Sequence, residues 1–271
     1  MKVAAIQMVS GTSISANLAA AHTLLAQAAQ AGAELAVLPE YFCLLGHKDT
    51  DKVHLREPAG QGQVQDFLSA TARELGLWLV GGTVPLATAD SSRVRNSSLA
   101  YAPSGDLVAR YDKIHLFRFD NGVERYDESR VLERGEVPVW FDMPARSGQS
   151  WRIALSVCYD LRFPELYRGY ASQGAQVLLV PSAFTHTTGQ QHWEVLLRAR
   201  AIENLAYVIA PAQGGTHENG RQTWGQSLVA GPWGELLAQQ SSGPGVVLAE
   251  LDWHYLQQCR QNLPALAHRV L

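Results

Sequence analysis

The chain has 271 residues, of which 46% are hydrophobic and 17% charged, and its 22 Lys and Arg against 25 Asp and Glu give a net charge of −3. This composition excludes an intrinsically disordered chain, which needs low hydrophobicity and high net charge. No basic cluster exceeds two residues, so nucleic acid is not an expected partner. No apolar run approaches the roughly 20 residues of a membrane span, and we expect no membrane contact.

The cysteines indicate a reducing compartment, and we expect a cytoplasmic protein. Cys43, Cys158 and Cys259 are far apart, odd in number and free of any CxxC pair, which argues against a disulfide framework. The first apolar run is broken by Gln7 and is more typical of a strand than of a signal peptide. The nine histidines have no metal-ligand spacing, and phosphate-loop and dinucleotide motifs are absent, so we expect no metal and no cofactor.

Short apolar runs alternate with helix-like stretches in the first half of the chain. A helix is predicted at 16–31, because this Ala- and Leu-rich stretch begins after Ser13 and Ser15 and stops at Gly32. A second helix is predicted at 64–75, where apolar residues follow one helical face. The predicted strands are 3–8, 35–38, 77–84 (interrupted by Gly81-Gly82), 97–102, 107–111 and 137–141, and 118–135 is a polar, charged stretch.

The second half repeats this alternation. Strands are predicted at 153–157, 176–180 and 207–212, with 227–230 and 245–251 closing the sheet, and helices at 164–172, 190–206 and 253–261. Strand–helix alternation favours an α/β or α+β fold. Three successive strands near residues 99, 108 and 139 lack helices between them, so some pairing should be antiparallel. No linker or repeat divides the chain, and a single domain over 1–271 is expected.

Three predicted strands end in residues with unusual chemistry. Glu40 follows the apolar run LAVLP, Lys113 follows VARYD, and Cys158 ends IALSVC. Ligands of open α/β sheets bind outside the carboxyl ends of strands. These residues also have plainer interpretations, as a surface carboxylate, a solvated lysine and a buried core cysteine. Their neighbours favour function, because Glu40 is flanked by apolar residues on both sides and the chain turns polar directly after Cys158.

Together the three residues suggest acyl transfer. Glu40 would accept the thiol proton, Cys158 would attack a carbonyl or nitrile carbon, and Lys113 would stabilise the oxyanion with the backbone N–H of Tyr159. A nearby lysine and the helix that begins at 164 should lower the pKa of the thiol. An embedded Glu40 must be paired or have a raised pKa, and a raised pKa suits a general base.

Other classes of protein are compatible with the same residues. A serine hydrolase of the α/β type is disfavoured because GxSxG is absent. A papain-like Cys–His enzyme would use His115 or His217 as its base, and a binding protein could retain the fold without catalysis.

The segments LAVLPEYF, RYDKIHLF and SVCYDLRFPELYR resemble the Glu, Lys and Cys motifs of the nitrilase superfamily of carbon–nitrogen hydrolases, in the same order. PSAF and HWEVLLRARAIEN extend the resemblance over nearly the whole chain. It implies a four-layer-type αββα sandwich with mixed sheets, and Glu40, Lys113 and Cys158 as base, oxyanion-stabilising lysine and nucleophile. It also implies a second glutamate, which matches Glu128 in YDESRVLERGE, although Glu124, Asp127, Glu133 and Glu136 lie nearby.

Within the superfamily, CYDLRFPE and GGTHENGRQTWGQSLVAGPWG resemble a branch of keto-acid amidases. One member of that branch acts on deaminated glutathione, to which PSAF and the later segment are closer, and the other acts on 2-oxoglutaramate. Both substrates carry a keto-acid carboxylate, which Arg162 could bind unless it pairs with Glu165. Tyr159, Phe184 and Thr188 are further expected substrate contacts, while His186 departs from the small or apolar residue expected there.

The resemblance also implies assembly of αββα units, and we expect a homodimer. The predicted helix at 190–206 carries Trp193, Leu196, Leu197 and Ala201, more apolar surface than one narrow stripe requires. It could equally be a plain core helix.

Overall fold

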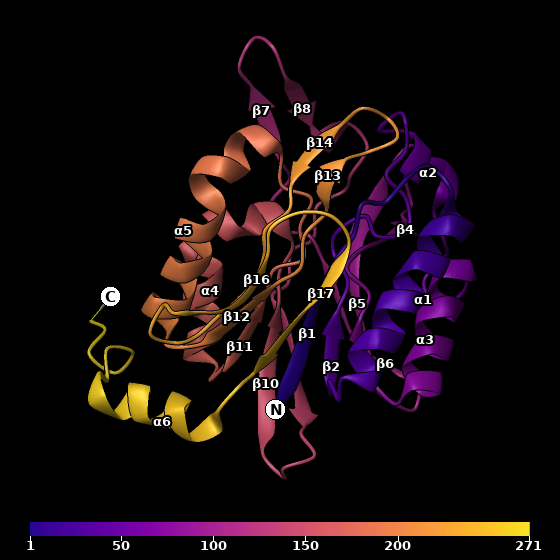
Figure 1. Cartoon of the computed structure of the whole chain (residues 1–271). Coiled ribbons are helices and arrows are strands. Elements are labelled where there is room, and N and C mark those ends of the chain that lie inside the picture. Colours follow the sequence, from indigo (N-terminus) through magenta and orange to yellow (C-terminus); the bar gives the residue numbers. More distant parts are fainter. Residues whose placement is uncertain (271) are drawn as a thin grey trace.

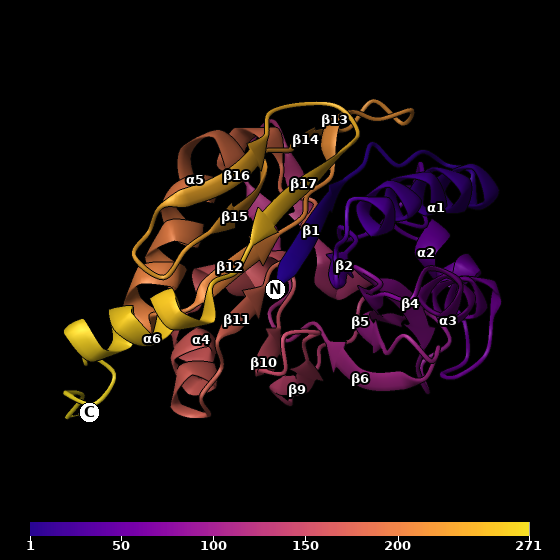
Figure 2. The same cartoon turned by 60° about the horizontal axis from the view of Figure 1, so that its bottom comes forward.

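The computed structural model describes residues 1–270 and consists of two β-sheets packed face to face, with helices on their outer faces (Figures 1 and 2). This arrangement confirms the predicted αββα sandwich. The first sheet has the order β17–β1–β2–β3–β5–β4, with β6 paired to β5. Its strands are β1 (Lys2–Gln7), β2 (Leu35–Val37), β3 (Trp78–Val80), β4 (Val84–Ala87), β5 (Val94–Tyr101), β6 (Leu107–Asp112) and β17 (Gly245–Glu250).

The second sheet has the order β16–β15–β12–β11–β10–β9. Its strands are β9 (Val139–Pro144), β10 (Ser150–Leu155), β11 (Val177–Leu179), β12 (Tyr207–Ala210), β15 (Ser227–Ala230) and β16 (Leu236–Gln240). Two hairpins stand apart from both sheets: β7 (Arg118–Asp120) with β8 (Arg125–Asp127), and β13 (Gly214–Thr216) with β14 (Gln222–Trp224).

The helices form the two outer layers, as Figure 2 shows. On the first sheet lie α1 (Ile14–Gln30) and α3 (Gln63–Leu75), with the short α2 (Asp51–Leu55) near β4; on the second lie α4 (Pro164–Ser172) and α5 (His186–Asn204). The terminal helix is α6 (Trp253–Asn262), and the 3-10 helices η1 (Glu128–Arg130) and η2 (Cys158–Arg162) lie in loops. Ser13 caps α1 by accepting a hydrogen bond from Ala16 N, as the sequence pattern indicates. None of the helices within residues 1–270 is both long and apolar enough to cross a bilayer.

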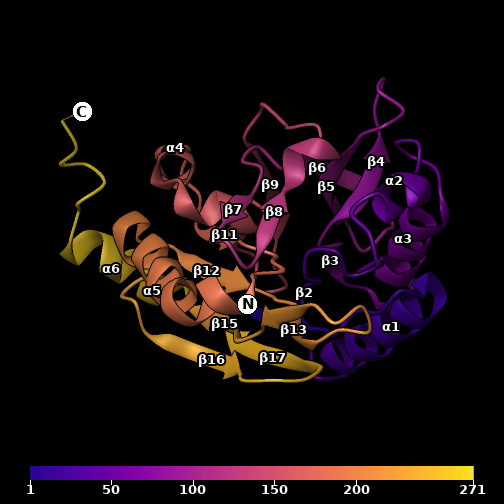
Figure 3. The ribbon, with the colours of Figure 1, turned by 90° about the horizontal axis from the view of Figure 1, so that it is seen from above.

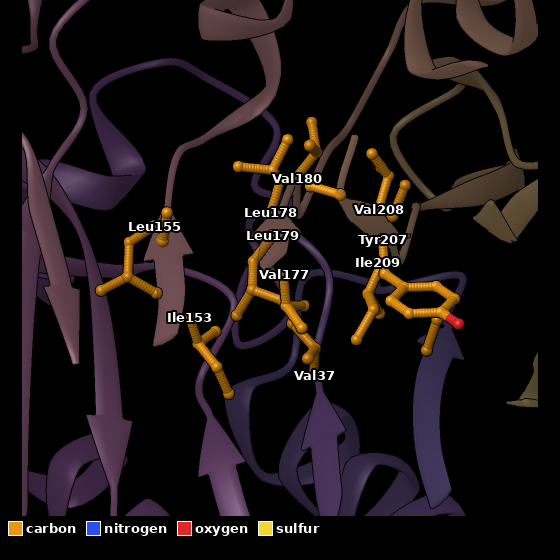
Figure 4. Packing of buried hydrophobic residues seen from close by; sticks show 14 of the residues in the cluster. Val37, Ile153, Leu155, Val177, Leu178, Leu179, Val180, Tyr207, Val208 and Ile209 are labelled. Carbon is orange, nitrogen blue, oxygen red and sulfur yellow. The ribbon is translucent and has the colours of Figure 1, made fainter. Parts of the chain in front are cut away.

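The core has one large cluster between the sheets, which continues beneath α4 and α5, and another beneath α1 and α3. Alternating residues of β1 belong to both clusters: Val3 and Ala5 pack in the cluster between the sheets, while Ala4 and Ile6 pack in the cluster under α1 and α3. Figure 4 shows part of the first cluster, in which Val37 of β2 packs with residues of β10, β11 and β12. Strands buried on both faces explain the continuous apolar runs in the sequence.

The structure corrects several boundaries. The stretch 77–84 contains β3 and the start of β4, which the turn at Gly81-Gly82 separates, and α5 begins at His186, four residues before the predicted start. The strands predicted to close one sheet belong to two sheets, since β15 pairs with β12 while β17 pairs with β1. The predicted antiparallel pairing is confirmed for β5 with β6, whereas β9 lies in the other sheet beside β10.

Strand direction determines where the site is built. In the first sheet β1, β2 and β3 are parallel, and β6 runs the same way because β5 is antiparallel to both β3 and β6. In the second sheet β10, β11 and β12 are parallel. The loops that follow β2, β6 and β10 therefore leave the carboxyl ends of strands that share a direction within their sheet.

Candidate active site

Glu40, Lys113 and Cys158 follow three of these strand ends, and the structure brings their side chains together. Glu40 lies three residues after β2, Lys113 directly after β6, and Cys158 three residues after β10. Glu40 and Lys113 form an ion pair at 2.9 Å, and their charges act on the Cys158 thiol. The site therefore takes two residues from the first sheet and one from the second.

Glu40 is only 1% exposed, and both of its carboxylate oxygens are hydrogen-bonded. Oε1 accepts from Lys113 Nζ at 2.9 Å and from Asn96 Nδ2 at 2.8 Å, while Oε2 accepts from the Ala183 backbone N–H at 2.9 Å. The carboxylate predicted to be paired is thus held by one group from β5, one from the strand-end lysine and one from the loop after β11.

Lys113 lies between two carboxylates. Its side chain is fully buried, and Nζ contacts Glu40 at 2.9 Å and Glu128 Oε2 at 2.9 Å. Burial by itself would lower the pKa of Lys113, but the charges of Glu128 and Glu40 outweigh it and raise the pKa above its usual value. The ammonium is therefore a permanent, rigidly held positive charge.

Glu128 occupies the second carboxylate position. Its Oε1 accepts a hydrogen bond from Tyr41 Oη at 2.9 Å, and its Oε2 accepts one from the Phe117 backbone N–H at 2.7 Å. Burial would raise the pKa of Glu128, yet the Lys113 charge holds it below the usual value. The neighbouring acidic residues have other surroundings: Glu133 pairs with Arg95, Asp127 caps η1, Glu124 bonds Thr187, and Glu136 is exposed.

Cys158 has a strained backbone with a positive φ of 49°. Its own N–H donates to Pro181 O at 3.0 Å, and the residue begins the 3-10 helix η2. Tyr159 is the second residue of that helix, where backbone N–H groups have no intrahelical acceptor. Strain of this kind is typical of positions where a side chain must be presented to a ligand.

The expectation that the Cys158 pKa is lowered is wrong. Burial raises the pKa of the thiol well above its usual value, and Glu40 and Glu128 raise it further, while Lys113 only partly opposes them. The cysteine is a thiol at neutral pH, because it is enclosed beside two carboxylates. Activation therefore requires a base.

Neither histidine of the Cys–His alternative is available as that base. His115 Nδ1 lies 2.7 Å from Asp160 Oδ1, and its ring stacks on Phe163 at 3.6 Å. His217 is enclosed between Ser10 O at 2.8 Å and Thr223 Oγ1 at 2.7 Å. The charged groups that act on the Cys158 thiol are Glu40, Lys113 and Glu128.

A cavity opens beside Cys158, and all four expected substrate contacts line it. Its walls are Phe117, Cys158, Tyr159, Arg162, Ala183, Phe184, Thr185 and Thr188. The Arg162 guanidinium lies 5.3 Å from the Phe184 ring centre and 5.8 Å from that of Tyr159, and its Nη1 is 3.1 Å from His192 Nδ1. Within residues 1–270 the side-chain contacts of Arg162 are with His192, Tyr159 and Phe184 and not with Glu165, so the expected alternative of a pair with Glu165 is not formed. His186 packs against Trp224, outside this cavity.

Two glycines allow close backbone contacts beside Glu40 and Lys113. A Cβ on Gly82, which has a positive φ of 47°, would lie 2.0 Å from the Pro39 carbonyl oxygen, one residue before Glu40. A Cβ on Gly135 would lie 2.0 Å from the Asp112 carbonyl oxygen, one residue before Lys113. Only glycine permits backbone contacts this close.

Sequence reasoning missed Tyr41 and Asn96, which support the carboxylates. Tyr41 has a positive φ of 57°, and its N–H donates to Thr83 Oγ1 at 2.9 Å. Asn96 is 3% exposed, although an amide in a strand normally faces water. The usable signal was its place directly before the predicted strand at 97–102, since an amide buried there requires polar partners.

The apolar residues that suggested a partner surface on α5 are largely buried in the core of this chain. Trp193, Leu197 and Ala201 are fully buried, and Leu196 is partly buried against the same cluster. The exposed apolar side chains of α5 are instead Val195 and Ile202.

Comparison with known proteins agrees with this geometry. Residues 2–261 match the family described as carbon-nitrogen hydrolase. The chain is 40% identical over 270 residues to "Deaminated glutathione amidase" of Synechocystis, covering 98% of this chain and 97% of the relative. It is 35% identical over 271 residues to "Omega-amidase NIT2-A" of Xenopus laevis, covering 99% and 94%.

A solved structure has the same fold. The NitFhit protein of C. elegans superposes with a TM-score of 0.90 at 36% identity, over 99% of this chain and 65% of that longer protein. Because the family match extends over nearly the whole sequence and the site is built from its strand ends, the chain belongs to the carbon–nitrogen hydrolase family, whose members break C–N bonds.

Proposed function

We propose that this chain is a cysteine-dependent amidase that hydrolyses a linear amide through a thioester, with deaminated glutathione as substrate. The observation that carries the proposal is the buried pairing of Lys113 with Glu40 and Glu128 beside a strained, enclosed Cys158. No cofactor is needed, because the three side chain types supply a nucleophile, a proton carrier and a fixed positive charge.

Acylation begins at Cys158. Glu40 accepts the thiol proton as the sulfur bonds to the amide carbonyl carbon, and the oxyanion is stabilised by the Lys113 ammonium and the Tyr159 N–H. Glu40 then returns the proton to the amine nitrogen as the C–N bond breaks. The raised pKa of the free thiol supports this concerted role for Glu40, since no stored thiolate is present.

Deacylation reuses the same base. Glu40 takes a proton from water, whose oxygen attacks the thioester carbonyl, and the C–S bond breaks to give the free acid and the Cys158 thiol. Glu128 is a positioning residue, because its carboxylate contacts Lys113 and keeps the ammonium charged and oriented. Its hydrogen bonds to Tyr41 and Phe117 N support that role.

The acyl group is recognised as a keto acid. Arg162 at the cavity wall offers a guanidinium that can bind a carboxylate in bidentate fashion. Tyr159, Phe184 and Thr188 line the same cavity and would contact the carbon chain. For deaminated glutathione the products are 2-oxoglutarate and cysteinylglycine; the similarity to the Synechocystis amidase favours this substrate.

The second candidate is an ω-amidase acting on 2-oxoglutaramate, which the similarity to the Xenopus protein supports. The acyl half of this substrate is the same, and only the leaving amine differs. A substrate panel therefore decides between them: deaminated glutathione, 2-oxoglutaramate, glutamine and simple nitriles, followed by coupled detection of 2-oxoglutarate or ammonia.

The panel includes two variants. Cys158→Ala should abolish turnover, and Glu40→Gln should reduce kcat by about 1,000-fold, since proton transfer contributes roughly 10²–10⁴-fold. If wild-type protein released no amine from any keto-acid amide, the assignment would be overturned in favour of a non-catalytic binding protein. If Cys158→Ala retained turnover, the cysteine-dependent mechanism would be overturned.

We further propose that the chain acts as a single carbon–nitrogen hydrolase domain over 1–271, in the cytoplasm, as a homodimer. Three free cysteines support a reducing compartment. Dimerisation through the outer side of α5 is supported by exposed apolar residues there and on the neighbouring turn, Val195, Ile202 and Trp233. Light scattering on wild type and Val195→Glu measures the assembly directly.

A further inference from the structure

A second hollow of about 530 Å³ lies next to the cavity at Cys158. It is bounded by residues 46–49, by 124–126 of the β7–β8 hairpin, and by 219–222 of the β13–β14 loop. Figure 1 shows both hairpins at the same end of the sandwich, and Figure 3 views that end from above. This volume falls in the range of pockets that hold small organic ligands.

One aromatic contact separates the hollow from the cavity. The Phe117 ring, which lines the cavity at Cys158, lies 5.7 Å from the ring of Tyr126, which lines the hollow. The hairpin is also tied to α5, because Thr187 Oγ1 donates to Glu124 Oε2 at 2.7 Å. A ligand at Cys158 can therefore reach the hollow within the length of a short chain.

Arg221 presents an unused guanidinium to the hollow. Among residues 1–270 it makes no side-chain hydrogen bond and no ion pair, and its Nε is enclosed without an acceptor. The guanidinium lies 5.0 Å from the Tyr126 ring centre. Its backbone is held in place, since Arg221 N donates to Asn219 Oδ1, and Asn219 Nδ2 donates to Gly46 O at 2.6 Å. A buried donor without an acceptor is unusual and points to a missing ligand.

Lys52 adds a second cation, which does not line the hollow but follows its wall residue Asp49 by three positions and lies close enough to Arg221 for the two charges to interact. Its side chain is 15% exposed, and its ammonium lies 4.6 Å from the ring centre of Tyr41. Burial lowers the pKa of Lys52 and the Arg221 charge lowers it further, while Asp49 and Glu128 oppose the shift. Asp49, at 3.8 Å, is the ion-pair partner of Lys52 and is itself 63% exposed. A bound anion would relieve the repulsion between the two cations.

The acidic side chains at this hollow are already engaged. Glu124 accepts hydrogen bonds from Thr187 at 2.7 Å and from Tyr126 Oη at 3.3 Å, and Asp49 lies beside Lys52. Three basic side chains, Lys48, Arg125 and Arg221, line the hollow against these two acidic ones, so the hollow favours an anionic ligand over a cationic one.

Lys52 is connected to Lys113 through Tyr41 and Glu128. The Tyr41 hydroxyl donates to Glu128, which contacts Lys113, whereas Arg162 lies beside Phe184 in the cavity at Cys158. A linear amide with a carboxylate at each end could bind Arg162 through one carboxylate and the pair Lys52 and Arg221 through the other. In a dipeptide amine the terminal carboxylate lies about 7 Å from the scissile bond, two residues of extended chain.

We propose that Arg221 and Lys52 form a second anion subsite, which binds the terminal carboxylate of a dipeptide leaving group. The inference rests on the proposed function and names the residues by which the enzyme would distinguish a peptide amide from 2-oxoglutaramate. The leaving group of 2-oxoglutaramate is ammonia, which carries no carboxylate. A charge-assisted hydrogen bond is about twice as strong as a neutral one, so losing the bond between this subsite and the carboxylate should raise KM for the peptide substrate measurably.

The test measures kcat/KM for deaminated glutathione and for 2-oxoglutaramate in wild type, Arg221→Gln and Lys52→Met. We expect the ratio of the two values to fall at least tenfold in each variant, through KM of the peptide substrate. The matched control is Arg125→Gln, which removes a charge from the same hollow but from an exposed side chain near Asp120. It should change the ratio less than twofold.

A substrate-side control completes the design. Amidating the terminal carboxylate of deaminated glutathione should raise KM in wild type and have no further effect in Arg221→Gln. The subsite is refuted if both substrates weaken equally, if neither changes, or if Arg125→Gln has the same effect. Wild-type protein that cleaves 2-oxoglutaramate but not deaminated glutathione would overturn the substrate assignment and the subsite together, while leaving the amidase chemistry intact.

Discussion

Glu128→Gln tests how far the site depends on a charge that does not touch the substrate. Every partner of the Glu128 carboxylate is a donor: Lys113 Nζ at 2.9 Å, Tyr41 Oη at 2.9 Å and Phe117 N at 2.7 Å. A glutamine amide has the same shape, but its NH₂ group must face at least one of these donors. The substitution therefore removes a buried charge and leaves a buried donor without an acceptor.

The expected loss of stability follows from these contacts. Breaking a buried ion pair costs about 3–5 kcal/mol, and we take the lower end because Lys113 keeps its pair with Glu40. A loss of about 3 kcal/mol lowers Tm by roughly 6–12 °C in a chain of this size. Lys113 should also turn toward Glu40, so that the oxyanion loses its aligned ammonium and kcat falls about 100-fold.

The assay combines urea unfolding, thermal melting and steady-state kinetics with a keto-acid amide. Glu136→Gln is the matched control, because Glu136 lies in the same loop region but is exposed; it should alter stability by less than about 0.5 kcal/mol. If Glu128→Gln kept the wild-type Tm and more than half of the wild-type kcat, the argument that Glu128 positions Lys113 would fail.

Three further predictions concern Gly82, the Cys158 thiol and the pH dependence of stability. Gly82→Ala should lower the free energy of unfolding measured in urea by about 3 kcal/mol, because the added Cβ would lie 2.0 Å from Pro39 O. Gly148→Ala is the control: Gly148 also has a positive φ but open space around it, so this variant measures the cost of the backbone conformation without the steric clash. Because burial raises the pKa of Cys158, alkylation by iodoacetamide should keep accelerating above pH 9, and a plateau below pH 8 would contradict the thiol assignment. Glu128 has a lowered pKa, so its stabilisation is complete above about pH 4.3 and is lost as pH falls through the folded value; the wild-type urea midpoint should drop more between pH 5 and pH 3 than that of Glu128→Gln.

The local pattern of the sequence was sufficient to predict most core elements. Strands such as β1, β2 and β11 are buried on both faces, so each appears as an apolar run. Short, charged or glycine-rich pieces were not predictable in this way. The hairpin β7–β8 consists of RFD and RYD, whose pairing depends on contacts with other parts of the chain.

The positions of Glu40, Lys113 and Cys158 were visible in the sequence because each places a reactive group within three residues of the end of a strand. Their motifs identified the family, but the supports of the site came from the structure. Tyr41, Asn96 and the Ala183 N–H reach the carboxylates from three different loops and strands. The lowered pKa expected for the thiol was wrong because the sequence does not reveal how deeply Cys158 is enclosed.

By itself, then, the amino-acid order determined which residue types are available and which segments must be buried, since burial follows from local hydrophobicity. Tertiary structure alone decided that 227–230 and 245–250 lie in different sheets and that the Arg221 charge acts on Lys52. The physical reason is that sheet pairing and the contact between sheets join residues far apart in the chain. Whether two such residues meet depends on all the intervening packing rather than on either local sequence.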